Sequence, residues 1–190
     1  MAPGTQLSMQ ELPSAELAPI VAQAIECPQV DRLDWQIQPI AGIAASQASG
    51  GLGLFRLIGS ATADGSVLPW SLIVKVVGGS NPIGDPSGTN QIPSAWNYWK
   101  REILAYRSGI LSQLSGNLVA PLCYGITEHP DDEWRIWLED IQESPKRWTL
   151  EHHGLAARHL GQFNGRYLAG QALPEAQPWL YRGRARDWVP

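Results

Sequence analysis

The chain has 190 residues, a formal net charge of −4 and a sequence pI near 5.5, with 44% hydrophobic and 17% charged residues. This composition suits one globular domain with a sizeable core, and the acidic balance argues against binding to nucleic acid or anionic lipid. With only two cysteines, no signal-peptide pattern and no apolar run near the roughly 20 residues that span a bilayer, the sequence predicts a cytoplasmic protein.

Residues 1–30 predict an N-terminal extension with one short helix from Ser14 to Ile25. Ser14 is placed to cap this helix, and apolar side chains recur at helical spacing at Leu17, Ile20, Val21 and Ala24. The next segment, Trp35–Ile40, alternates large apolar and polar residues and indicates a half-buried strand.

A loop of small residues, Gly42–Gly53, leads into a second strand at Leu54–Ile58. Small residues let the backbone approach phosphate oxygens and offer N–H groups to them. The loop lacks the Gly-Lys-Ser/Thr ending of a P-loop and no helix follows it, so a flexible hairpin loop is the alternative interpretation.

The segment Ser71–Val77 predicts a buried strand, preceded by a hairpin turn at Asp64-Gly65. Alternation places Lys75 between Ile73 and Val77 on one face of this strand. Because removing an ammonium group from water is costly, either the stem of Lys75 reaches the edge of the sheet or an anion lies nearby. The first three strands form an antiparallel meander in this interpretation.

A long helix is expected over Ala95–Arg107, with Ser94 as its N-cap. Glu102 falls on an aromatic stripe of this helix beside Trp99 and Tyr106 and has no cation at helical spacing. A pair between Glu102 and Lys75 would satisfy both charges.

Two further strands, Asn117–Ile126 and Glu133–Leu138, are followed by a helix from Thr149 to about Ala169. The fold class is therefore α+β, a five-stranded antiparallel sheet with one long helix, followed by the start of a helical part. The nine tryptophans have no regular spacing, so we interpret most of them as core residues. The final helix carries three histidines without zinc-ligand spacing, and we interpret them as ordinary helix residues: His152, His153 and His159.

These parts, in this order, resemble the N-terminal lobe of the aminoglycoside phosphotransferase-like kinases, which include choline and maltose kinases. The resemblance rests on the small-residue loop, strand lysine, helix glutamate, Leu138–Ile141 and the helix containing Ala156–Gly165, and it covers about residues 30–190. It implies a kinase-like ATP-binding lobe over 31–141, then a hinge exit and the beginning of a helical lobe over 142–190.

The resemblance also implies roles for individual residues. Lys75 would contact the α- and β-phosphates of ATP, Glu102 would hold Lys75 in place, and Ile73 would pack on the adenine ring. Backbone groups of Glu139 and Ile141 would meet the adenine edge. The loop would cover the phosphates through four small residues: Ser46, Ser49, Gly50 and Gly51.

The catalytic end departs from the family pattern. Such kinases need a His-x-Asp catalytic loop and a further Asp for Mg²⁺, but the three histidines of the last helix are followed two residues later by Gly154, Leu155 and Gly161. We therefore assign no catalytic residue and no metal ligand. The expected function is the ATP-binding lobe of a small-molecule phosphotransferase whose intact parent, with Mg²⁺, phosphorylates a hydroxyl acceptor, while this truncated chain has no turnover.

Two alternatives stay open: a non-catalytic module that binds a nucleotide or a partner chain, and a tryptophan-rich sugar-binding protein with several exposed Trp side chains. The truncated-kinase hypothesis also predicts self-association through residues 150–170, or folding of that helix back onto the sheet. The reason is that later helices, which would cover its apolar stripe in an intact kinase, are absent from this sequence.

Overall fold

The structure is a computed structural model that describes residues 12–40, 51–79, 88–114, 117–142, 147–171 and 177–180. Its helices and strands are α2 (Ser14–Ala24), β1 (Arg32–Pro39), β2 (Gly51–Ala63), β3 (Ser66–Gly78), α3 (Arg101–Arg107), β4 (Cys123–His129), β5 (Glu133–Glu139) and α4 (Leu150–Leu168). Two short 3-10 helices are η2 (Thr89–Gln91) and η3 (Ile110–Gln113).

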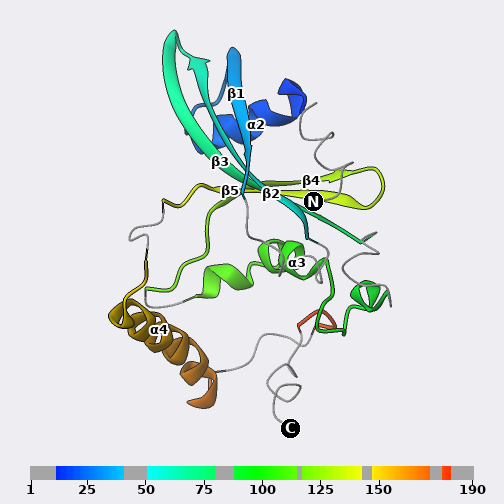
Figure 1. The fold of residues 1–190 in the computed structure, drawn as a ribbon, viewed down its shortest axis with the longest axis vertical. Helices are drawn as coiled ribbons and strands as arrows, with labels where there is room; N and C mark the ends of the chain where they lie inside the picture. Colours follow the sequence, from blue (N-terminus) through cyan, green and yellow to red (C-terminus); the bar gives the residue numbers. More distant parts are fainter. Residues whose placement is uncertain are drawn as a thin grey trace.

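The five strands form one antiparallel sheet in the order β1-β2-β3-β5-β4 (Figure 1), which confirms the expected α+β class and the predicted meander. The predicted hairpin turn joins β2 to β3, with φ of 49° at Asp64 and 74° at Gly65. Left-handed backbone at both central positions gives a turn whose twist matches that of the flanking strands. The β4–β5 turn uses the same geometry at Asp131 and Asp132.

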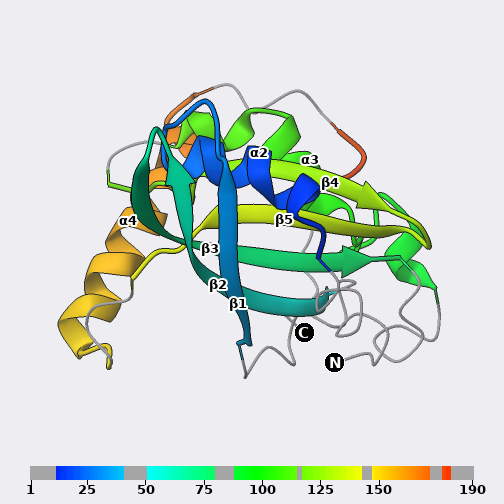
Figure 2. The ribbon, with the colours of Figure 1, turned by 90° about the horizontal axis from the view of Figure 1, so that it is seen from above.

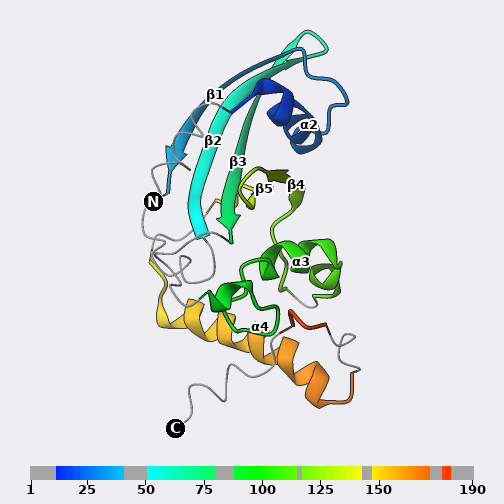
Figure 3. The same ribbon diagram turned by 90° about the vertical axis from the view of Figure 1, so that its right-hand side faces the viewer.

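Alternation along β3 divides the core into two layers. Leu72, Val74 and Val76 are fully buried on one face, in a cluster with the apolar side chains of α2, β1 and β2. Ile73 and Val77 face the other way and pack with residues of α3 and β5. Figures 1 and 3 show α2 and α3 on opposite sides of the β4–β5 strands. We call the face that carries Ile73, Lys75 and Val77 the lysine face.

The expected long helix from Ala95 to Arg107 is wrong in its first half, because α3 begins only at Arg101 and Ser94 caps nothing. The guanidinium of Arg101 donates to the carbonyl oxygens of Ala95 and Trp96, at 2.7 and 2.6 Å, and to that of Trp179 at 2.7 Å. These side-chain bonds take up carbonyls that a continuing helix would use, so the segment before Arg101 turns instead.

The longest helix is α4, and its predicted cap is confirmed. Thr149 and His152 form a reciprocal capping box, in which the Thr149 hydroxyl accepts from the backbone of His152 and His152 Nδ1 accepts from the backbone of Thr149. Figures 1 and 3 show α4 set apart from the sheet, and in Figure 2 it extends to one side. None of its described side chains is buried. Leu155 and Leu160 are each 52% exposed, so self-association through this helix stays a prediction.

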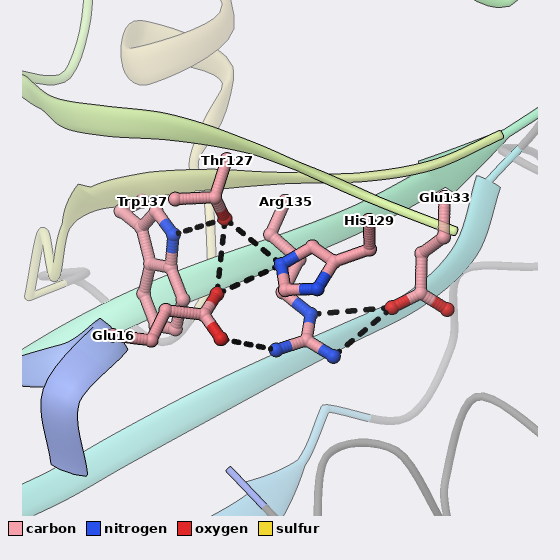
Figure 4. A network of polar contacts seen from close by, with 6 residues as sticks. All are labelled: Glu16, Thr127, His129, Glu133, Arg135 and Trp137. Carbon is pink, nitrogen blue, oxygen red and sulfur yellow. Dashed lines mark hydrogen bonds and ion pairs between the residues drawn. The ribbon is translucent and has the colours of Figure 1, made fainter. Parts of the chain in front are cut away.

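Helix α2 is fastened to the sheet through Glu16, not through the Ser14 cap that the sequence suggested; its N-cap is Pro13, without a side-chain cap bond. One carboxylate oxygen of Glu16 accepts from Arg135 of β5 at 3.0 Å. The same guanidinium binds Glu133 at 3.1 Å, and Arg135 is only 3% exposed (Figure 4). A buried cation is thereby shared by two carboxylates from different elements.

The other oxygen of Glu16 is held from β4. It accepts from the Thr127 hydroxyl at 3.0 Å and lies 2.9 Å from His129 Nε2 (Figure 4). Because an ionised carboxylate can only accept, His129 carries a proton on Nε2. Thr127 in turn accepts from the indole N–H of Trp137 at 3.1 Å. The first described helix is therefore connected by polar contacts to both strands of the β4–β5 hairpin.

Candidate functional site

The candidate site lies on the lysine face of β3. Lys75 pairs in the sheet with Leu54 of β2 and Ile136 of β5, so its ammonium stem rises from the middle of the sheet with a strand on either side. Its side chain is 24% exposed. Because Lys75 lies on a central strand, its ammonium does not extend past the sheet edge, and an anion on this face would balance its charge.

Glu102 of α3 provides that anion. Lys75 Nζ donates to Glu102 Oε2 in an ion pair that joins β3 to the helix lying on the lysine face, as the spacing predicts. Helix α3 is fixed there by Ile103, which is 1% exposed, and by Trp99 before it. Although α3 is shorter than expected, its Glu102 is still directed towards the sheet.

Tyr106 lies one helical turn after Glu102. Its burial, together with the charge of Glu102, raises the pKa of Tyr106 to about 12. Desolvation and a neighbouring carboxylate both disfavour a phenolate, so the hydroxyl stays protonated across the physiological range. Burial likewise raises the pKa of the Cys123 thiol on the adjoining strand. The Tyr106 hydroxyl and the Cys123 thiol are therefore neutral, and neither adds a second negative charge near Glu102.

The segment that the resemblance identifies as a hinge, residues 139–141, leaves the sheet at the end of β5. The backbone N–H of Glu139 donates to the carbonyl of Leu122 at 2.9 Å, and the Glu139 carboxylate accepts from the N–H of Leu122 at 3.1 Å. The Glu139 side chain therefore points to the edge near β4. Ile141 is 53% exposed. Ile73, assigned to the adenine ring, lies half-buried beside Leu138 on the lysine face.

Sequence reasoning missed an ion pair that crosses this face. Arg56 of β2 donates from Nε to both carboxylate oxygens of Asp140, at 3.0 and 3.1 Å. The Asp140 side chain is 2% exposed and that of Arg56 is 36% exposed. The available signals were weak: Arg56 is the one charge in an apolar strand, and Asp140 follows the acidic Glu139.

Of the four residues assigned to the phosphate loop, the structure describes only Gly51. Ser46, Ser49 and Gly50 lie outside the described residues. Gly51 was assigned to the loop but begins β2, where it is buried and pairs with Val77. The ladder extends further than the apolar pattern suggests because glycines in this stretch still pair through their backbone. Gly51 is therefore a strand residue.

Other residue classes are placed as follows. Trp70, Trp99, Trp134, Trp137 and Trp179 are buried, which favours the core interpretation, while the exposed Trp96 and Trp148 lie on different segments. Within the described residues, no group of three His, Cys, Asp or Glu side chains could hold a metal ion. Over the same residues, no helix is both long and apolar enough to cross a membrane.

Comparisons with protein-family models, with curated proteins and with solved structures find no match to this chain.

Proposed function

We propose that this chain is the ATP-binding lobe of a small-molecule phosphotransferase. The observation that carries the proposal is the Lys75–Glu102 ion pair, made between the central strand of a five-stranded antiparallel sheet and the helix on its face. An ammonium held by one carboxylate keeps further N–H donors for an anion, and phosphate oxygens are the anions expected beside a small-residue loop. That loop joins β1 to β2.

The order of elements supports the same proposal. In the kinase-like lobe that the sequence resembles, a glycine-rich hairpin, a strand lysine and a helix glutamate precede two strands and a hinge. The described elements follow this order from β1 to β5, and residues 139–141 leave β5 on the way to α4.

The residues present suit the base and the first two phosphates of ATP. Lys75 would neutralise phosphate charge, and Glu102 would orient Lys75. Ile73 and the backbone of Ile141 would receive the base, because the N–H of Glu139 is already bonded to Leu122. In an intact kinase ATP would supply its γ-phosphoryl group to a hydroxyl acceptor, with a catalytic aspartate accepting the hydroxyl proton, Mg²⁺ held by its own ligands, and ADP leaving. Those ligands are not assigned in this chain, so binding without turnover is the proposed behaviour.

A non-catalytic nucleotide-binding module is the second candidate function. It is favoured by the absence from this sequence of an aspartate two residues after any histidine of α4. This module would bind a nucleotide at the same Lys75 site, but it would not derive from an enzyme that phosphorylates an acceptor. Both candidates predict nucleotide binding at Lys75 without phosphoryl transfer by this chain. A transfer assay with purified protein and hydroxyl acceptors therefore tests them together, and any detected transfer would contradict both.

ATP binding is testable by titration. We expect a dissociation constant on the order of 0.1 to 1 mM without steady ATPase activity, because phosphate charge is neutralised by Lys75 and not by a bound metal. Lys75→Ala should weaken binding about tenfold or more, since a charge-assisted contact to phosphate is lost. NMR titration of the wild type and of Lys75→Ala measures these dissociation constants.

Lys100→Ala is the matched control, because Lys100 immediately precedes α3 and its ammonium lies over the rings of Trp99 and Trp134, whereas Glu102 pairs with Lys75. It should leave the affinity unchanged. Equal affinity in wild type and Lys75→Ala would contradict the proposed site, and micromolar, magnesium-dependent affinity with turnover would contradict binding without catalysis.

A further inference from the structure

The Arg56–Asp140 pair lies where the proposed function places the nucleobase. Arg56 pairs across the sheet with Ile73, and Ile73 pairs with Leu138 on its other side. Asp140 is two residues beyond Leu138 and so follows it on the same face. The side chain of Arg56 therefore crosses β3 beside Ile73 and binds Asp140.

The direction along β3 is also fixed by the register. Lys75 lies opposite Leu54, and the next residues on this face, Ile73 and Arg56, lie one step closer to the hinge segment. If the phosphates bind at Lys75, then Ile73 and Arg56 lie on the side of Lys75 where the base binds. The guanidinium thus lies at the base end of the site.

The pair leaves the guanidinium available to a ligand. Asp140 binds Arg56 through Nε alone, and both oxygens of the buried carboxylate are used for this single N–H. No Nη contact of Arg56 accompanies these bonds among the described residues, and the side chain is 36% exposed. A guanidinium anchored at one nitrogen has lost part of its rotational freedom and keeps its flat face and outer donors for a partner.

We propose that Arg56, positioned by Asp140, stacks on the base of the bound nucleotide and makes the site selective for purines. The inference rests on the proposed function. A guanidinium plane stacks on any flat aromatic ring, and the larger face of a purine offers it more contact than that of a pyrimidine. Asp140 acts as a positioning residue, because it fixes the plane and does not itself reach the base.

The test is a titration of ATP, GTP, CTP and UTP into wild type, Arg56→Ala, Arg56→Lys and Asp140→Asn, followed by NMR. The wild type should bind ATP and GTP about five- to tenfold more tightly than CTP and UTP. Arg56→Ala should lose most of this preference. Arg56→Lys, which keeps the charge but not the plane, should not restore it, and Asp140→Asn should reduce it partly.

Arg32→Ala is the matched control, because Arg32 makes a similar pair with Asp34, at 3.1 Å, on the solvent-exposed surface of β1. It should change neither affinity nor preference. The inference would be overturned, and the proposed function kept, if nucleotide binding depended on Lys75 but Arg56→Ala kept the purine preference. Tighter nucleotide binding to Arg56→Ala would have the same meaning. Absence of nucleotide binding to the wild type would overturn the proposed function and the inference with it.

Discussion

Replacing Gly59 with alanine is expected to lower the free energy of unfolding by about 3 kcal/mol. A Cβ at this position of β2 would lie 2.2 Å from the backbone oxygen of Asp34 and 2.6 Å from the ring of Trp70. Neither neighbour can move cheaply, because one is ladder backbone of β1 and the other is a ring that is 6% exposed. The added methyl must therefore displace a strand or a buried indole.

Urea denaturation of Gly59→Ala and of Gly154→Ala measures this effect against a matched change. Gly154 lies inside α4, and a Cβ there meets no atom within 4 Å. Because alanine has the better helix propensity, Gly154→Ala should raise stability by about 0.5 to 1 kcal/mol. A Gly59→Ala protein as stable as the wild type would show that β1 does not pair with β2 in the described register.

Removal of Arg135 is the other change with a large expected effect. Arg135→Ala should cost about 3 to 5 kcal/mol of stability, since it withdraws the buried cation that Glu16 and Glu133 share. The loss should also loosen α2, because Glu16 is its polar connection to β5. Chemical denaturation gives the energy, and hydrogen exchange of the α2 amides reports the loosening.

Arg32→Ala is the control for Arg135→Ala, because the Arg32–Asp34 pair is exposed at 74% and 63% and should contribute under 1 kcal/mol. A double-mutant cycle with Glu16→Ala isolates the coupling between Glu16 and Arg135. The polar cluster would be unimportant for docking α2 if Arg135→Ala cost no more than the surface variant.

Local patterns predict much of this fold because their causes are local. The β-branched run around Val74 predicts a central strand, the Asp64-Gly65 dipeptide predicts the turn before it, and Thr149 predicts the start of α4. The causes are the periodicity of burial, a positive φ and a side-chain cap, respectively. Each of them acts within a few residues.

Long-range contacts decide what the sequence does not predict. The first half of the expected helix before Arg101 is lost to bonds that include the carbonyl of Trp179, 78 residues away. Arg56 and Asp140 are 84 residues apart, and Glu16 and Arg135 are 119 apart. No periodicity connects such positions, so only the fold shows which charges meet. The Lys75–Glu102 pair was predicted because both residues lacked a local partner.

The most direct test of the central claim is chemical labelling with an ATP derivative that carries a lysine-reactive acyl group on its terminal phosphate. Lys75, Lys100 and Lys146 are the lysines of the chain. If ATP phosphates lie at the Lys75–Glu102 pair, mass spectrometry should find the acyl group mainly on Lys75, and excess ATP should suppress it. Equal labelling of the three lysines, or labelling of Lys75 that ATP does not suppress, would contradict a nucleotide site on this face of the sheet.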